Sequence, residues 1–346
     1  MIKLPDEAVE FFTVNYPNIF AEGALAEGEW LKKTSEWCKS YSGAGYSEVF
    51  NSNGSGIFAI LSILKRFRGK TDYFIQSNTM YGVKTMSEAA GLTFVGAVPC
   101  ELSSLMPTAS TVEAFINTIP NPRHSVFILT HIGGWVNPEI EDIVKVCNAA
   151  GVALIEDCAH SLGATLNNKH TGTFGLAGVY SLYATKAVPA GEGGVLITDD
   201  EELGDLLSRF IMYDRFRQEM NIGVNMRMSE LNALLAYSVI RHTDAIIDNK
   251  KTIAKRYEAV CERKGIVYLK PELDGQRSNL YKFIILDDTD QGCSRFRPIT
   301  NRTSPVYDYT LGADPQNIIK NHICLPIWYK LEEDIVAKTV EQIALC

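Results

Sequence analysis

Short apolar runs rich in β-branched and aromatic residues alternate with longer stretches of helical periodicity through the first half of the chain. Five such runs predict strands, at residues 47–50, 72–76, 93–98, 125–130 and 152–157. Four helical stretches lie between or after them, at residues 56–68, 83–90, 112–118 and 138–150. This alternation implies right-handed crossovers and an α/β fold, with a mostly parallel sheet and helices on both faces.

Two further apolar runs, at 179–183 and 194–198, follow without a long helix between them. A crossover between parallel strands needs such a helix, so we expect a mixed sheet.

A long helical pattern begins near Ser229, a good N-cap residue, and continues to about Lys264, with room for a bend midway. Shorter elements follow, namely strands near 266–269 and 281–286 and a helix from about 332 to 344. We therefore expect a large domain over residues 1–245 and a smaller α/β domain over residues 246–346.

The composition is that of a globular enzyme, with 46% hydrophobic and 21% charged residues in a chain of 346. The net charge of −8 argues against nucleic acid or an anionic membrane as the main partner, because the overall field repels both. A local basic pocket for a phosphate remains compatible with that charge.

The eight cysteines are widely spread, with no C-x-x-C pair and no clustered histidines, so the sequence predicts no metal site. The first residues lack the basic and then apolar layout of a signal peptide, and no apolar run approaches the roughly 20 residues of a membrane span. We expect a cytoplasmic protein with reduced thiols.

Asp157 ends the apolar run 152–157 and is followed by Cys158, Ala159 and His160. Ligands of parallel α/β sheets bind outside the carboxyl ends of the strands, so Asp157 stands where an acid that faces a ligand is expected. An aspartate that caps a helix after a strand would look the same, and Asp157 alone does not decide between the two.

Lys186 follows the run 179–183 and precedes a loop with three glycines, Gly191, Gly193 and Gly194. Such a loop lets the backbone approach a ligand closely. A partly desolvated lysine there would have a lowered pKa and react as a nucleophile toward aldehydes. Most lysines are solvated surface charges, so this interpretation depends on Asp157 and Lys186 acting together.

The loop 51–56 (Asn-Ser-Asn-Gly-Ser-Gly) lies between a predicted strand and a predicted helix. Free N–H groups at a helix start can bind an anion such as phosphate, although an ordinary tight turn would have the same composition. The spacing fits neither the dinucleotide-binding glycine pattern nor a Walker loop.

Together these segments resemble the DegT/DnrJ/EryC1/StrS family of sugar aminotransferases. The specific signature is Gly172-Thr-Phe-Gly-(x)₃-Val-Tyr-Ser-Leu-Tyr-Ala-Thr-Lys186-(x)₄-Gly-Glu-Gly-Gly194. The similarity is also dense over residues 155–163 and 223–235, and looser from about 23 to 340. It implies fold type I of the pyridoxal 5′-phosphate enzymes, with a mostly parallel, mixed sheet of seven strands between helices and a smaller C-terminal domain.

The resemblance implies three catalytic residues. Lys186 would form the Schiff base with pyridoxal phosphate and carry protons between the two halves of the reaction, which passes through pyridoxamine phosphate. Asp157 would pair with the pyridine nitrogen and keep it protonated, so that the ring accepts electrons. His160 would lie near the ring hydroxyl of the cofactor.

The resemblance also implies how the cofactor is held. Ser181 would bind the phosphate with the backbone N–H groups of Gly54 and Ser55. Asn225 would reach the phosphate from the neighbouring subunit, so that the active sites exist only in a homodimer. Met80 would pack on the pyridine ring.

Three positions depart from the family pattern. Met80 stands where an aromatic residue usually stacks on the ring, with Tyr81 beside it as the alternative. Ala187 replaces an asparagine after the lysine, and a usual histidine is replaced near Leu280. These departures affect the expected substrate pocket and leave the expected cofactor chemistry intact.

The expected reaction is transfer of an amino group from glutamate or glutamine to a 3- or 4-keto sugar carried on a nucleotide. The product would be an amino sugar for a surface polysaccharide or a glycosylated metabolite. A cyclitol or a small keto-phosphate is an alternative acceptor. Sugar dehydratases of the family carry a histidine in place of Lys186, which argues against dehydration. A regulatory homologue without turnover would not need the Asp157–Lys186 pair.

Overall fold

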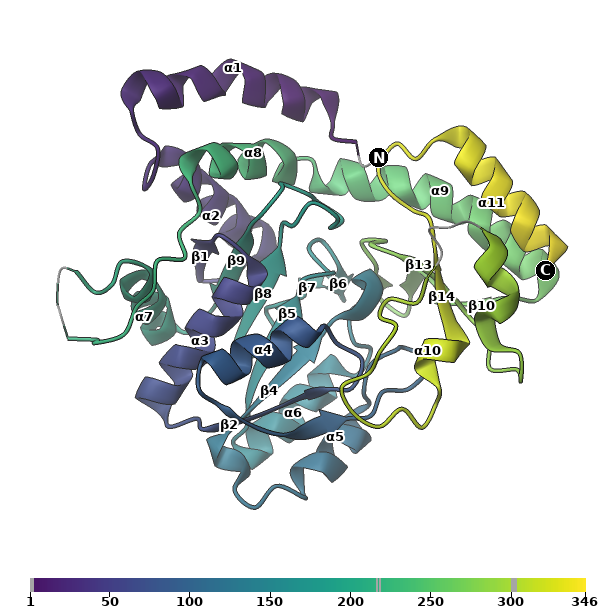
Figure 1. Ribbon diagram of the computed structural model, residues 1–346, viewed down its shortest axis with the longest axis horizontal. Helices are drawn as coiled ribbons and strands as arrows, with labels where there is room; N and C mark the ends of the chain where they lie inside the picture. Colours follow the sequence, from purple (N-terminus) through teal and green to yellow (C-terminus); the bar gives the residue numbers. More distant parts are fainter. Residues whose placement is uncertain (1–2, 216, 218, 300–303) are drawn as a thin grey trace.

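The computed structural model describes residues 3–215, 217, 219–299 and 304–346. Its centre is a sheet of seven strands (Figure 1). Their order across the sheet is β1 (Tyr46–Phe50), β9 (Gly194–Thr198), β8 (Ala177–Ser181), β5 (Ala153–Cys158), β4 (Ser125–Thr130), β2 (Asp72–Gln76) and β3 (Thr93–Val98). Only β9 runs antiparallel to its neighbours, β1 and β8, and the other pairs are parallel. The predicted mixed sheet of seven strands is therefore confirmed.

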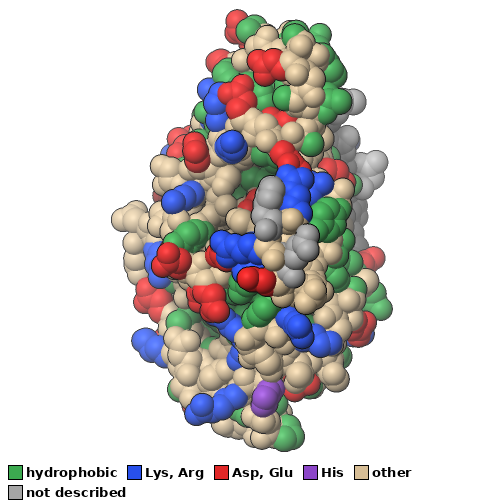
Figure 2. All heavy atoms as spheres, turned by 90° about the vertical axis from the view of Figure 1, so that its left-hand side faces the viewer, with side chains coloured by type: hydrophobic (Ala, Val, Ile, Leu, Met, Phe, Trp, Pro, Cys, Tyr) green, Lys and Arg blue, Asp and Glu red, His purple; other side chains and the backbone are tan. Residues whose placement is uncertain are grey.

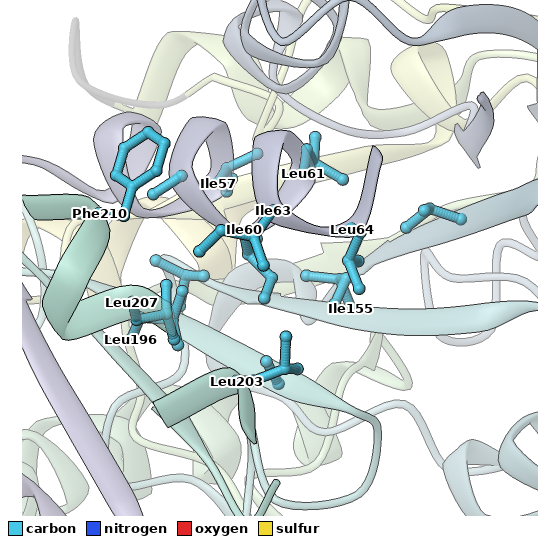
Figure 3. Packing of buried hydrophobic residues seen from close by; sticks show 14 of the residues in the cluster. Ile57, Ile60, Leu61, Ile63, Leu64, Ile155, Leu196, Leu203, Leu207 and Phe210 are labelled. Atoms are coloured by element: carbon cyan, nitrogen blue, oxygen red, sulfur yellow. The ribbon is translucent and has the colours of Figure 1, made fainter. Parts of the chain in front are cut away.

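Helices cover both faces of this sheet. One face carries α3 (Asn53–Arg68), α4 (Tyr81–Ala89) and α7 (Glu201–Ile211). In Figure 3, side chains of α3 lie over those of the sheet, namely Ile57, Ile60 and Leu64 over Ile155 and Leu196. Beside them lie Leu203, Leu207 and Phe210 of α7. The other face carries α2 (Glu29–Ser42), α5 (Ala109–Ile116), α6 (Ile140–Ala150) and α8 (Glu230–Ile240). Because strand side chains alternate between the faces, Leu154 and Ile155 belong to different cores.

The long helical pattern of residues 229–264 forms two helices, α8 and α9 (Thr243–Lys264), separated by a turn at Arg241 and His242. Ser229 caps the first of them by accepting a hydrogen bond from the N–H of Asn232 (3.3 Å). Figure 1 shows α9 leading from the large sheet to the C-terminal region. The predicted break midway and the predicted cap are both confirmed.

The C-terminal region has its own antiparallel sheet, β10 (Val267–Tyr268), β13 (Phe283–Leu286) and β14 (His322–Leu325). The helices α9, α10 (Ile318–Asn321) and α11 (Glu333–Leu345) lie around it (Figure 1). A small third sheet consists of β11 (Glu272–Leu273), β12 (Gln276–Arg277), β6 (Thr165–Leu166) and β7 (Lys169–His170). Because this third sheet joins segments from both sides of residue 245, a domain boundary there stays a prediction.

Helix α1 (Asp6–Glu22), together with α2 and α7, was not predicted from the sequence. Short 3₁₀ turns occupy η1 (Pro122–His124), η2 (Ile132–Gly134) and η3 (Gly292–Ile299). On the face shown in Figure 2, basic and acidic side chains are interspersed. None of the helices in the described part of the chain combines the length and apolar character that crossing a membrane requires.

Candidate active site

Asp157 lies at the carboxyl end of β5, directly opposite Thr130 in the neighbouring strand β4. Its side chain is only 2% exposed. One carboxylate oxygen accepts hydrogen bonds from Asn53 Nδ2 and the Ala159 N–H, each at 3.1 Å, and the other accepts from Thr130 Oγ1 at 3.2 Å. Three elements therefore fix the orientation of this acid.

Burial raises the pKa of Asp157, because a charged carboxylate loses its hydration there. The Ala159 N–H, the Lys186 ammonium group and the side chains of Asn53 and Thr130 act in the opposite direction. Only three donors at 3.1–3.2 Å reach this buried carboxylate among the described residues, so it is suited to bind a cationic N–H group of a ligand as well.

His160 follows one turn later and is buried. Its Nδ1 accepts a hydrogen bond from the Gly133 N–H (3.3 Å), so the proton of the neutral ring is on Nε2, which lies 3.4 Å from Tyr307 Oη. Burial, followed by the charges of Lys186 and Lys282, lowers the pKa of His160 well below its usual value. The ring is neutral at physiological pH and presents an N–H donor.

Lys186 comes five residues after the end of β8, in the loop that leads to β9. Its backbone N–H donates to Tyr183 O (2.9 Å), and its Nζ lies 5.2 Å from the centre of the Tyr281 ring. Two glycines make this loop possible. A Cβ on Gly194 would lie 2.4 Å from the backbone of Ser52, and one on Gly193 would lie 2.4 Å from Met228 Cε.

The start of α3 lies against this loop, because β1 and β8 both pair with β9 at Gly194. Ser52 caps the helix by accepting from the Ser55 N–H (3.1 Å), so that one of the two predicted phosphate donors already has a partner. Gly54 precedes it in the first turn. Ser181, at the end of β8, is buried and its Oγ accepts from the Tyr183 N–H (3.3 Å).

Met80 and Tyr81 are both about half exposed, at 53% and 55%, where α4 begins. The Tyr81 N–H donates to Tyr309 Oη (2.8 Å). Asn225 is exposed, and its Oδ1 accepts from the Arg227 N–H (3.5 Å). The structure brings Asp157, His160, Lys186, Ser181 and the start of α3 to one edge of the sheet, whereas no hydrogen bond joins Asn225 to them within the described chain.

Glu156 has a role that sequence reasoning missed. It is fully buried, and its carboxylate accepts the N–H groups of Gly172, Phe174 and Gly175, each at 2.7 Å, and lies 2.8 Å from His131 Nε2. It thereby holds the Gly-Thr-Phe-Gly turn that leads into β8. Cys158 lies close enough to Glu156 and His131 for the three side chains to form a candidate metal site. The hydrogen bonds described above, however, already occupy the Glu156 carboxylate.

A cavity of about 200 Å³ adjoins Lys186. Its wall is formed by the lysine loop, α9, the two residues before β13, and the end of β14 with the segment that follows it. The lining residues are Lys3, Thr185, Lys186, Ala187, Pro189, Ile246, Lys250, Tyr281, Lys282 and the run 324–329.

The family model of the DegT/DnrJ/EryC1/StrS aminotransferases matches residues 9–344. This chain belongs to that family. Among curated members it is 23% identical to the spore coat polysaccharide biosynthesis protein SpsC of Bacillus subtilis, over 93% of this chain and 90% of that protein. It is 27% identical to the putative pyridoxal phosphate-dependent aminotransferase EpsN of the same organism, over 83% and 81% of the two chains.

Solved structures of the family share the fold. The aminotransferase TlmJ of Streptoalloteichus hindustanus superposes with a TM-score of 0.85 at 20% identity, covering 100% of this chain and 98% of that one. PseC of Helicobacter pylori, an aminotransferase of pseudoaminic acid biosynthesis, gives 0.85 at 19% identity, with 99% and 96% coverage. The family membership makes the chain a pyridoxal phosphate-dependent aminotransferase, and the predicted fold class, enzyme class and cofactor are confirmed.

Proposed function

We propose that this aminotransferase moves an amino group from glutamate or glutamine to a 3- or 4-keto sugar carried on a nucleotide. The product would be an amino sugar for a surface polysaccharide or a glycosylated metabolite. The names of relatives support this substrate class, among them a transaminase of Helicobacter pylori that forms a UDP-linked amino sugar, 24% identical over 70% of this chain. The observation that carries the proposal is the meeting of buried Asp157 with Lys186 at the carboxyl end of the sheet.

The residues at this edge fit pyridoxal phosphate by the chemistry of their donors. Asp157 would hold the pyridine N–H, and the amine of Lys186 would bind the aldehyde carbon. Ser181 and the N–H groups of Gly54 and Ser55 would hold the phosphate at the positive end of α3, where Ser55 has to share its N–H with Ser52. Met80 would cover the ring.

When bound, pyridoxal phosphate supplies an electron sink for the carbon that gains or loses the amine. The protein controls the protons around it. Lys186 Nζ would take a proton from the carbon of the amino donor in one half-reaction and deliver a proton to the carbon of the acceptor in the other. The neutral His160 would donate its Nε2–H, and Asp157 would keep the proton on the pyridine nitrogen.

Asn225 is proposed to serve the active site of a second copy. Its side chain is exposed and makes no hydrogen bond to Asp157 or Lys186 of its own chain among the described residues, which agrees with such a role. The working form would then be a cytoplasmic homodimer with shared sites.

Replacement of Lys186 tests the proposal directly. Lys186→Ala should abolish amino transfer to 3-keto and 4-keto nucleotide sugars with glutamate as donor, measured by product mass. Lys169→Ala, which alters an exposed lysine in β7, is the matched control and should remain active. A fully active Lys186→Ala protein would overturn the assignment. A wild-type protein that aminates cyclitols or keto-phosphates but no nucleotide sugar would overturn the proposed substrate class.

A further inference from the structure

Lys250 is a buried lysine in the wall of the cavity beside Lys186. It lies in the middle of α9, and its side chain is 2% exposed. No hydrogen bond or ion pair to it is found among the described residues, whereas its neighbour Lys251 pairs with Glu272 at 2.6 Å. A buried ammonium group without an anion is costly, because its lost hydration is not replaced.

All charged side chains that line this cavity are lysines, so its charge is positive. Lys186 and Lys282 line it with Lys250, and so does Lys3, which pairs with Glu332 at 3.5 Å. No aspartate or glutamate of the described chain belongs to the lining. Apart from Thr185, the remaining wall is apolar or aromatic, with Trp328 as its largest side chain. Low-dielectric walls strengthen the positive potential inside.

We propose that Lys250 and Lys282 form the subsite for a phosphate of the nucleotide-linked substrate, next to the reactive amine of Lys186. This inference rests on the proposed function and adds the residues that would recognise the nucleotide part. A lysine ammonium group binds phosphate as a compact charge with three donors. Lys250 and Lys282 stay free when Lys186 holds the cofactor, and two lysines in one cavity suit an anion with more than one charge better than a single carboxylate.

The protonation of Lys250 agrees with this assignment. Burial lowers its pKa to about 7, so the ligand-free cavity holds the charge only in part. A bound phosphate would stabilise the ammonium form and supply the anion that the protein lacks.

Inorganic pyrophosphate is the probe for this subsite. Calorimetry with the pyridoxal phosphate-loaded enzyme should detect its binding, and Lys250→Met should weaken that binding at least tenfold. Lys255→Met, which alters an exposed lysine on the same helix, should change it less than twofold. Lys282→Met should also weaken binding, and it provides the test if the Lys250 variant does not fold.

Kinetics separate this role from a purely structural one. Lys250→Met should raise KM for the nucleotide-linked acceptor at least tenfold and leave KM for the amino donor unchanged, while the melting temperature without ligand stays equal or rises. Equal pyrophosphate affinity of wild type, Lys250→Met and Lys282→Met would overturn the subsite. So would a rise in the KM of the donor alone, which would assign the lysines to a donor carboxylate.

The two proposals can fail separately. If the wild-type enzyme aminates a nucleotide sugar and both variants keep its KM, the substrate class stands and the subsite is wrong. If pyrophosphate binding depends on Lys250 but no nucleotide sugar is aminated, the subsite stands and the acceptor is another phosphorylated ketone.

Discussion

Glu156 and Asp157 are consecutive residues of β5, so their carboxylates point to opposite sides of the strand. Glu156 accepts three backbone N–H groups and contacts His131, which leaves it little capacity for a ligand. Asp157 has three weaker or longer contacts and lies at the edge where α3 begins. The first carboxylate organises the backbone, and the second is proposed to act on the cofactor.

Replacement of Asp157 should affect chemistry more than folding. Asp157→Asn removes the negative charge proposed to face the pyridine nitrogen and should lower kcat by about 10²-fold or more. Steady-state kinetics with the pyridoxal phosphate-loaded enzyme would measure this change. Asp142→Asn, at an exposed position of α6, is the control. Unchanged kcat in Asp157→Asn would contradict the proposed contact.

Replacement of Glu156 should affect folding. Glu156→Gln puts an NH₂ group against backbone N–H donors and removes a buried, hydrogen-bonded charge. We expect the free energy of unfolding to fall by about 3–5 kcal/mol, measured by urea denaturation. Glu141→Gln on the surface of α6 should change it by less than about 0.5 kcal/mol. A similar small change in both variants would show that the Gly-Thr-Phe-Gly turn does not depend on Glu156.

The positions of Asp157 and Lys186, at a strand end and in a glycine-rich loop, follow from local patterns. Their roles toward the cofactor follow from the family resemblance and stay predictions. Asn53 and Thr130 could not be predicted, since their contacts to Asp157 depend on which strands are neighbours in the sheet. Lys250 was also missed. Its helical stretch is rich in charged residues, and nothing in it shows which lysine faces a cavity.

At the scale of elements, several predicted strands coincide with observed ones because their apolar runs are buried on both faces, as in β2 and β4. The sequence of helix α1 has no comparable apolar pattern that would predict a helix. Only Ala8 and Ile19 of α1 are buried, Pro17 lies inside it, and its packing partner α8 is two hundred residues away. Helix α2 is capped from a similar distance, because Glu230 accepts the N–H groups of Gly28, Trp30 and Leu31.

His322, the first residue of β14, connects the backbone at Val306 with that of α10. Its Nδ1–H donates to Ile318 O (2.5 Å), so its Nε2 accepts from the Val306 N–H (2.8 Å), close to Tyr307 and thus to His160. Protonation of Nε2 would break the second bond. Burial is the main reason that the pKa of His322 is lowered to about 4.

Stability should therefore depend on pH through this histidine. Between about pH 6.5 and 4 the unfolded chain binds a proton at His322 that the folded chain does not. The free energy of unfolding should therefore fall as pH decreases, by at most about 3.4 kcal/mol. Urea denaturation across this range would measure the slope. His322→Gln should reduce it, whereas His124→Gln, at an exposed position, should leave it unchanged. Equal slopes in both variants would refute this attribution.

At the scale of the whole molecule, the proposed sharing of Asn225 predicts complementation between inactive subunits. Lys186→Ala and Asn225→Ala proteins, each with little activity alone, should recover activity when co-refolded in equal amounts. Half of the dimers would then be mixed and each would contain one intact site, giving about a quarter of wild-type activity. Co-refolding each variant with itself is the control. Absence of recovery in a mixed dimer shown to form would place Asn225 in its own subunit's site or outside both.

The strand order also constrains how the protein is made on the ribosome. Among the described residues, the edge strand β1 pairs with β9 alone, so this pairing cannot be complete until Thr198 has been synthesised. At ordinary rates of translation this interval lasts roughly 10–30 s, during which the unpaired strand and the start of α3 are exposed to wrong pairings. Because β9 follows the lysine loop, Lys186, Asp157 and the start of α3 come together in the nascent chain only when that late strand inserts.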